Sequence, residues 1–202
     1  MNRADVDIIE KTEVYRGRFQ VFRYRLRHRL HAGGWSGIVT REVFERGHAA
    51  AVLPYDPLRD EVVLIEQFRP GAYAAGGDPW LLEIVAGIID ADESAEDVAH
   101  REAKEEANLI LEDLLPVAHC FMTPGACSES LQIFCGRTDS TGAGGVFGLP
   151  TEHEDIRVLA VPFAEARRML DTLELRNAIT VISMQWLALH RDRLRREWRM
   201  PS

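Results

Sequence analysis

The sequence predicts a mixed α/β layer fold, in which short strands are interleaved with a few helices. Strand-like apolar segments recur along the whole chain. Few helical patterns interrupt these segments, and they do so without the regular alternation of a βαβ repeat. The 202 residues, 46% of them hydrophobic, fit one main domain with a small N-terminal addition and suffice to bury a core.

Composition and charge exclude several classes of function. A formal net charge of -8 argues against non-specific binding to nucleic acid or to acidic membranes. No stretch approaches the ~20 apolar residues that span a bilayer, and the N-terminus lacks the apolar core of a signal peptide. The spacing of the three cysteines matches no CxxC metal site, so we expect reduced, buried thiols and a cytoplasmic location; they are Cys120, Cys127 and Cys135.

Residues 1–46 are expected to form an N-terminal β-domain ahead of a main domain at 47–202. From Phe22 the chain alternates between an apolar face and an arginine face. The apolar residues are Phe22, Tyr24, Leu26 and Leu30, and the basic ones are Arg23, Arg25, Arg27 and Arg29. Arginines on one face could serve phosphates or a partner subunit, although a solvated edge that prevents aggregation is the favoured interpretation. A turn at residues 31–34 leads to a second strand at 38–45.

The main domain begins with a predicted hairpin at residues 48–68, built around the turn DPLRD. Further strands are predicted at 80–85, 117–122, 131–136 and 158–162, and helices at 95–107, at 163–173 and from Asn177 towards Trp198. Asn177 is a good N-cap for the last helix, whose expected apolar stripe is Ile179, Ile182, Trp186 and Leu189. The glycine-rich stretch at 141–148 predicts a mobile loop.

The helix at 95–107 carries an unusual group of acids. Ser94 and Asp97 form a capping-box-like start, and alanines recur every four residues on a thin face that can approach a sheet. Glu102, Glu105 and Glu106 lie within one turn of each other and repel unless a cation lies among them. Carboxylate oxygens suit Mg2+. Geometry alone leaves two alternatives open, a magnesium site and an ordinary solvated acidic face.

The spacing of this segment resembles the Nudix box of the Nudix hydrolases. Gly87 is followed after five residues by Glu93, and after seven more by the run Arg101-Glu102-Ala103-Lys104-Glu105-Glu106. The resemblance implies an α/β/α sandwich and cleavage of a nucleoside diphosphate linked to another group. It also implies that Glu102, Glu105, Glu106 and the carbonyl of Ala86 bind two or three Mg2+ ions, with Mn2+ as an alternative, while Glu93 pairs with Arg101. Asn108 replaces the usual glycine, and asparagine is the next-best residue for a left-handed helix end.

Most of the chain is similar to the bacterial ADP-ribose pyrophosphatases. The matching stretches include YRGRF, REVFERGHAAAVLPYDP, DEVVLIEQFR and PWLLEIVAG. This resemblance implies a homodimer in which the N-terminal sheet is swapped between subunits and completes the partner's adenine pocket. Arg41 and Glu42 match adenine-recognition positions, and Arg69 a residue against base or phosphate. Arg18 stands where an aromatic is expected, so stacking falls to Arg18 itself or to Phe19.

The resemblance also implies a catalytic base on a closing loop, here residues 148–155. By position Glu152 is the candidate, Glu154 is second, and His153 is more simply a solvated residue. Glu129 matches a position near the metals that would hold a water or an ion. The predicted reaction is hydrolysis of ADP-ribose to AMP and ribose 5-phosphate. The alternatives are hydrolysis of another nucleotide sugar, such as GDP-mannose, and a sensor that binds ADP-ribose without cleaving it.

Overall fold

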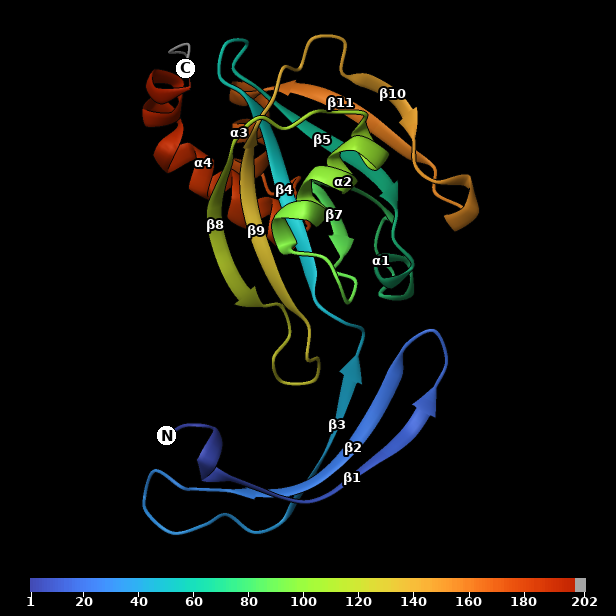
Figure 1. The fold of residues 1–202 in the computed structure, drawn as a ribbon, viewed down its shortest axis with the longest axis vertical. Coiled ribbons are helices and arrows are strands. Elements are labelled where there is room, and N and C mark those ends of the chain that lie inside the picture. Colours follow the sequence, from blue (N-terminus) through green and yellow to red (C-terminus); the bar gives the residue numbers. More distant parts are fainter. Residues whose placement is uncertain (199–202) are drawn as a thin grey trace. The chain divides into compact units, whose positions relative to one another are not determined.

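An eight-stranded mixed sheet forms the centre of the larger of two structural units (Figure 1). The computed structural model describes residues 1–198. One unit comprises residues 1–48 and 121–130, and the other comprises the rest of the chain from residue 49. The sequence places the boundary near residue 46 but gives no reason to assign 121–130 to the N-terminal unit.

The strands of the larger unit run in the order β10-β11-β5-β4-β9-β8, while β6 pairs with β5 and β7 pairs with β4. β4 and β9 are parallel, and β4 is antiparallel to both β5 and β7. The strands are β4 Ala49–Asp56, β5 Glu61–Phe68, β6 Trp80–Glu83, β7 Val85–Ile88, β8 Leu114–Phe121, β9 Ser130–Arg137, β10 Gly144–Phe147 and β11 Ile156–Pro162.

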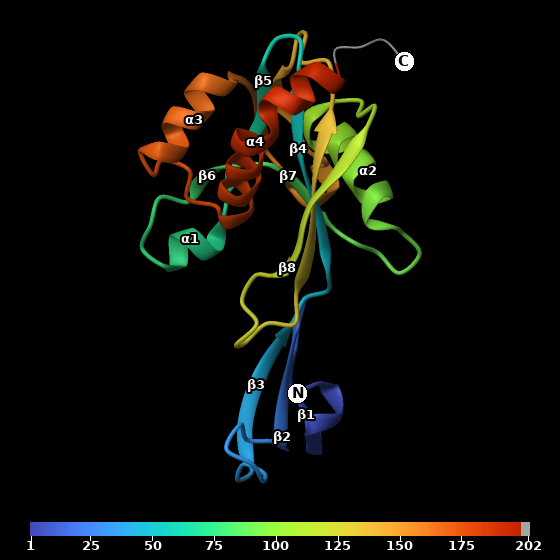
Figure 2. The same ribbon diagram turned by 90° about the vertical axis from the view of Figure 1, so that its left-hand side faces the viewer.

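Helices cover both faces of this sheet. Figure 2 shows α2 on one side of the strands and α3 and α4 on the other, which confirms the expected α/β/α layering. The helices are α1 Pro70–Ala74, α2 Ala95–Ala107, α3 Phe163–Asp171 and α4 Ala178–Glu197, with short 3-10 turns η1 Arg3–Asp5 and η2 Pro150–Glu152. None of the helices within residues 1–198 is long and apolar enough to cross a membrane.

The core under α2 follows from the alternation of side chains along the strands. Val63 and Ile65 of β5 belong to the buried cluster that includes Ala99 and Ala103 of α2. Leu64 lies between them in the strand and therefore points to the opposite face, where it is fully buried. The alanine repeat of α2 thus serves as predicted, because small side chains let the helix backbone approach the sheet.

Both ends of α2 are formed as the sequence predicts. The Ser94 hydroxyl oxygen accepts a hydrogen bond from the Asp97 amide at 3.1 Å, and the Asp97 carboxylate accepts one from the Ser94 amide at 3.2 Å. At the other end Asn108 adopts the left-handed conformation, with φ of 52°. Its side-chain oxygen also accepts a hydrogen bond from Lys104 Nζ at 2.6 Å.

The long helix α4 begins at its predicted cap, but of the expected apolar stripe only Ile179 is buried, while Ile182 and Trp186 are partly buried. Asn177 accepts hydrogen bonds from the amides of Ile179 and Thr180. Leu189, expected in the apolar stripe, is 83% exposed. The buried residues are Ile179, Thr180, Ser183, Met184, Leu187 and Leu194. The prediction was wrong in part because two hydroxyl residues, Thr180 and Ser183, belong to the buried face and make their hydrogen bonds inside the protein.

Three segments differ from the prediction. Residues 144–147 form β10, antiparallel to β11, within the stretch expected to be a mobile loop. The predicted strand at 80–85 is two strands, because β6 pairs with β5 whereas β7 crosses to β4. The short helix α1, which begins with Pro70 at its first position, had no clear sequence signal.

The N-terminal unit contains a three-stranded antiparallel sheet in the order β1-β2-β3. These strands are β1 Val6–Arg16, β2 Gln20–His28 and β3 Val39–Glu45. The arginines of β2 are solvated as expected, with side chains 45–49% exposed. They lie in a central strand, however, so the expectation of an edge was wrong, and acids of both neighbouring strands pair with them. The ion pairs are Arg23–Glu42, Arg25–Glu10 and Arg27–Asp7, at 2.8–3.2 Å.

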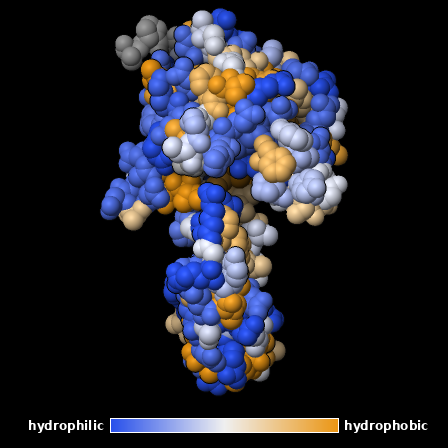
Figure 3. Space-filling model, turned by 90° about the vertical axis from the view of Figure 1, so that its right-hand side faces the viewer, coloured by the Kyte–Doolittle hydropathy of each residue, from blue (hydrophilic) through white to orange (hydrophobic). Residues whose placement is uncertain are grey.

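This small sheet leaves apolar side chains uncovered within the single chain. Ile8 is 53% exposed and Tyr15 is 60% exposed, both on β1. Figure 3 shows apolar residues interspersed with charged ones on the visible face of the unit. No residue of these three strands is buried within the single chain, whereas a sheet of this size needs a covered apolar face for independent stability.

Asn108 provides a test of how α2 ends. Asn108→Ala is expected to lower the free energy of unfolding by about 1–2 kcal/mol, because alanine tolerates the left-handed backbone poorly and the Lys104 contact is lost. Urea denaturation measures the change. Asn108→Gly is the matched control and should lie close to wild type; equal losses for both variants would contradict the backbone explanation.

Candidate active site

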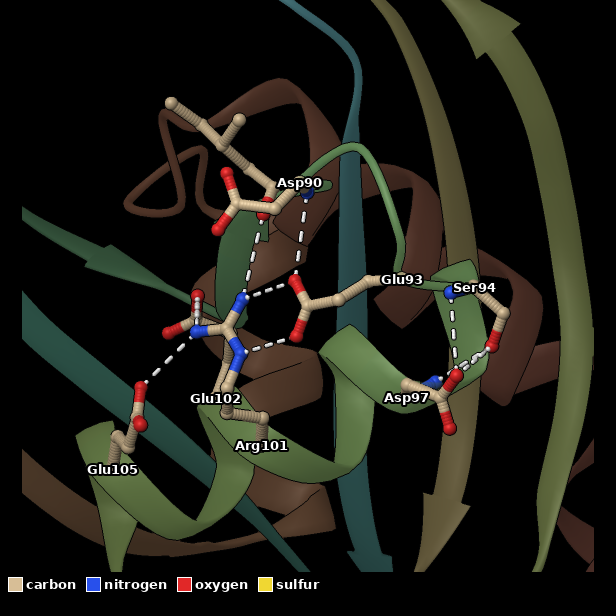
Figure 4. Close-up of polar contacts among 8 residues, drawn as sticks. Asp90, Glu93, Ser94, Asp97, Arg101, Glu102 and Glu105 are labelled. Carbon is tan, nitrogen blue, oxygen red and sulfur yellow. Dashed lines mark hydrogen bonds and ion pairs between the residues drawn. The ribbon is translucent and has the colours of Figure 1, made fainter.

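The segment from β7 through α2 gathers the predicted acidic residues around one arginine. Figure 4 shows the Arg101 guanidinium between the carboxylates of Glu93, Glu102 and Glu105. Arg101 Nε and Nη2 donate to Glu93 at 2.8 and 3.0 Å, so the expected Glu93–Arg101 pair is present. These bonds lower the pKa of Glu93 and raise that of Arg101. The pair ties the loop before α2 to the helix.

Arg101 also contacts two of the predicted metal ligands. Its Nη1 atom donates to Glu102 Oε1 at 2.8 Å and to Glu105 Oε2 at 3.1 Å. Among the side chains that the structure describes, no three acids, histidines or cysteines are gathered closely enough to hold an ion as they stand. The guanidinium therefore supplies the positive charge beside Glu102 and Glu105 in this arrangement.

Gly87 makes room for Glu102. A Cβ atom at residue 87 would lie 1.7 Å from Glu102 Oε1 and 2.6 Å from its Cγ, so any larger residue would displace this carboxylate. The glycine of the box is thus explained by close approach of a side chain to the strand backbone. Burial raises the pKa of Glu102, an effect that Arg101 opposes and the charges of Glu105 and Glu154 reinforce.

Glu106 is the most deeply buried acid of α2, at 3% exposure. Its Oε2 accepts a hydrogen bond from the Ala86 amide at 3.2 Å. Burial raises the pKa of Glu106 to about 8, and the nearby charges of Glu102 and Glu154 add to the effect. Ala86 thus contacts the site through its amide, and the role expected of its carbonyl remains a prediction.

The loop between β10 and β11 brings a further glutamate to these acids. Glu154 accepts a hydrogen bond from the Leu149 amide at 3.0 Å, and its charge acts on both Glu102 and Glu106. Gly148 permits this loop, because a Cβ there would lie 2.6 Å from that of Glu154. The backbone of Glu152 lies in η2, but its side chain is outside the part that the structure describes.

Arg69 is held by an acid that the sequence analysis did not single out. Its Nε and Nη2 atoms donate to Glu83 Oε2 at 2.8 and 2.6 Å, and Glu83 is 1% exposed. The charge of Arg69 lowers the pKa of Glu106, opposing the effect of burial. The signal for Glu83 was available in the sequence, as a single charge within the apolar run LLEIV.

The remaining predicted residues belong to the N-terminal unit. Glu42 already pairs with Arg23 at 2.8 Å, and Arg41 Nη1 donates to the carbonyl of Thr40. Adjacent residues on a strand face opposite ways, so Arg41 and Glu42 do not lie on one face of this sheet.

Phe19, Glu129 and Arg46 form a second group within this unit. The guanidinium carbons of Arg18 and Arg46 lie 5.9 and 5.7 Å from the centre of the Phe19 ring. Arg46, which sequence reasoning missed, also lies 3.3 Å from Glu129. Glu129 is buried, at 9% exposure, so a charge partner for it is expected.

The donor set fits a divalent cation. Carboxylate oxygens on one face of α2 repel each other, and two of them are largely removed from water, so a compact cation would relieve both costs. An α/β/α sandwich that carries such an acidic helix on one face is the architecture of the Nudix hydrolases. The chain belongs to the NUDIX family, whose domain model matches residues 45–181.

Several proteins are similar in sequence or in fold to the chain. The chain is 51% identical over 196 residues to the ADP-ribose pyrophosphatase of Escherichia coli K12, covering 97% of this chain and 94% of that protein. It is 39% identical over 201 residues to the ADP-ribose pyrophosphatase of Haemophilus influenzae, covering 98% and 93%. A GDP-mannose pyrophosphatase of E. coli O1:K1 is 35% identical over 151 residues, covering 74% and 78%. The crystal structure of an ADP compounds hydrolase matches the fold with a TM-score of 0.71 at 22% identity, covering 97% of both chains.

The burial of Glu106 predicts an unusual dependence of stability on pH without divalent ions. Its pKa is about 8 in the folded protein and near 4.5 when the chain is unfolded. The folded state therefore binds the proton more tightly, and the resulting stability is full below pH 4.5 and lost as pH rises through 8. Glu106→Gln, which cannot ionise, should become more stable than wild type by on the order of a few kcal/mol at pH 9.

Thermal unfolding in EDTA from pH 5 to pH 9 measures this difference. Glu96→Gln, on the exposed first turn of α2, is the control and should run parallel to wild type. If the Glu106→Gln curve also stays parallel to wild type over this range, Glu106 is not ionising in a buried environment.

Proposed function

We propose that this protein hydrolyses ADP-ribose to AMP and ribose 5-phosphate in a reaction that requires Mg2+. The observation that carries the proposal is the pair of desolvated carboxylates, Glu102 and Glu106, packed against Gly87 and Ala86. Such a pair is costly unless a cation completes it. The two relatives that match nearly the whole chain, at 51% and 39% identity, are both named ADP-ribose pyrophosphatase.

Glu102, Glu105, Glu106 and the carbonyl of Ala86 are the proposed metal ligands, for two or three Mg2+ ions or for Mn2+ in their place. Bound divalent ions would supply positive charge to the diphosphate and to the water that attacks it. Arg101 occupies one oxygen of Glu102 and one of Glu105, so the other oxygen of each carboxylate can bind a metal while the two bonds of Arg101 to Glu93 persist. Arg101 then still fixes the loop against α2.

The proton of the attacking water requires an acceptor. Water adds to one phosphorus, the bridging P–O bond breaks, and the proton passes to a carboxylate of the loop at 148–155. Glu152 is the residue expected by position. Glu154 is supported by its electrostatic effect on Glu102 and Glu106, which requires its carboxylate to lie near them.

Substrate recognition is assigned to Arg69 and to residues of the N-terminal unit, which would complete the adenine pocket of the partner subunit. Arg69 would contact the diphosphate or the base, and Arg41 and Glu42 the adenine; both bonds from Arg23 go to Glu42 Oε1, so Oε2 can accept from the base. Phe19 and Arg18 are the proposed stacking residues, and the contact between them supports a shared platform. Glu129 would hold a water or an ion, with its carboxylate oriented by Arg46.

The proposed state is a homodimer in which the N-terminal sheet is exchanged between subunits. The exposed apolar residues of β1 support this state, because Ile8 and Tyr15 would be covered by a second copy. Three of the four residues of the arginine face, Arg23, Arg25 and Arg27, already pair with acids of the same sheet. No nucleic acid or membrane is required by any residue assigned here.

Hydrolysis of GDP-mannose is the second candidate, because the matching relative of that name is 35% identical. A sensor that binds ADP-ribose without cleavage ranks below both, since all three box carboxylates are present on α2.

A substrate panel separates these functions. Wild type with Mg2+ is expected to release AMP and ribose 5-phosphate from ADP-ribose faster than it cleaves GDP-mannose or a dinucleotide. Glu106→Gln should lose on the order of three powers of ten in kcat while remaining folded. Chromatography identifies the products and circular dichroism verifies the fold. Turnover of Glu106→Gln near the wild-type rate would refute the metal assignment.

The choice of base is tested by Glu152→Gln and Glu154→Gln. The variant that removes the base should lose about 100-fold or more in kcat with little change in KM, and the other should lose much less. Glu165→Gln, an exposed acid of α3, is the control. If neither loop variant loses activity beyond this control, the base does not lie on this loop.

A further inference from the structure

A carboxylate that the proposed reaction does not use is buried at the end of β6. Glu83 is 1% exposed, and its neighbours in the chain are Leu82 and Ile84. A buried charge is costly unless its partners are well placed. An apolar residue here would suit the strand better, so the carboxylate must be explained by its contacts.

Both oxygens of Glu83 are occupied. Oε2 accepts from Arg69 Nε at 2.8 Å and from Nη2 at 2.6 Å, while Oε1 accepts from Asn177 Nδ2 at 2.8 Å. The orientation of the Asn177 amide is fixed independently, because its oxygen accepts from the amides of Ile179 and Thr180 at 3.0 and 3.2 Å. The first turn of α4 therefore holds Glu83, and Glu83 holds Arg69.

These contacts use only part of the Arg69 guanidinium. A guanidinium has five N–H donors, and among the described residues none accepts a bond from Nη1. The Arg69 side chain remains 40% exposed although Glu83 beside it is buried. Its positive charge also acts on Glu106 of the acidic site. One edge of the guanidinium is thus anchored, and the other is available to a ligand.

We propose that Glu83 is a positioning residue, which with Asn177 fixes the guanidinium of Arg69 for an anionic diphosphate beside the acidic helix. The inference rests on the proposed function, since it names the device that orients one of its substrate contacts. A free arginine side chain loses rotamer freedom when it binds an anion, and the bonds to Glu83 remove that loss in advance.

Asp60 forms carboxylate–arginine contacts with α4 that have no part in the proposed site. Asp60 accepts bonds from the Tyr55 hydroxyl and from Arg191 and Arg195 near the C-terminal end of the helix. Both of these arginine side chains are 25% exposed, and neither is among the main causes of the shifted pKa of Glu102 or Glu106. The Asp60 group is therefore a matched control for loss of a carboxylate–arginine contact.

A double-mutant cycle tests the proposal, with Glu83→Gln, Arg69→Ala and the double variant. The probe is the α,β-methylene analogue of ADP-ribose, which cannot be cleaved at the bridge, and calorimetry with Mg2+ gives its Kd. Glu83→Gln should raise Kd about ten-fold or more when Arg69 is present, but less than about two-fold in the Arg69→Ala background. Equal factors in both backgrounds would overturn the positioning role.

Two further variants keep this result interpretable. Asp60→Asn should lower Tm while leaving Kd unchanged; an equal rise in Kd would mean that loss of stability alone weakens binding. If Glu83→Gln does not fold, Asn177→Ser replaces it in the cycle, because serine still caps α4 but removes the donor to Glu83. That variant should raise Kd in the same Arg69-dependent manner, and a rise independent of Arg69 would contradict the proposal.

Measurements on wild type distinguish failure of the positioning role from failure of the proposed function. If it cleaves ADP-ribose and binds the analogue but the cycle is additive, only the positioning role fails. If wild type neither binds the analogue nor cleaves ADP-ribose, the proposed function fails and the inference falls with it.

Discussion

Desolvation of like-charged carboxylates on one helix is the constraint on which the rest of this structure depends. Glu106 is 3% exposed and Glu102 lies against the backbone of Gly87. Isolated acids in such positions would be protonated or would move to solvent. The fold keeps these carboxylates from moving to solvent, because α2 packs against the sheet through Ala99 and Ala103 and is capped at both ends.

Two arginines supply positive charge to this acidic site, one by direct contact and the other through its electrostatic effect. Arg101 touches Glu102 and Glu105 directly and is anchored by Glu93, whereas Arg69 acts on Glu106 and is anchored by Glu83. Each arginine thus has a carboxylate that holds it and a second group on which it acts. Such an arrangement suits a site that binds cations and anions in turn. Glu93 and Glu83 can keep the two arginines in place while the contacts of these arginines with the other groups change.

The sequence predicted the parts of this arrangement that depend on local spacing. The start of α2 at Ser94, its left-handed end at Asn108 and the Glu93–Arg101 pair all follow from residues close together in the chain. It did not predict Glu83 with Asn177, which are 94 residues apart, because their contact depends on packing of α4 against the sheet. β10 was missed for a related reason, since its glycines indicate a loop and only pairing with β11 makes them a strand.

The most direct measurement of the central claim is calorimetric titration with Mg2+ of wild type and of Glu102→Gln at pH 7.5. Replacing Glu102, whose side chain is 14% exposed, removes one of the carboxylates whose mutual repulsion a bound cation would relieve. Wild type is therefore expected to bind Mg2+ with a measurable heat, and Glu102→Gln about ten-fold or more weakly. Equal Mg2+ affinity in both proteins, or no binding by wild type, would contradict the account.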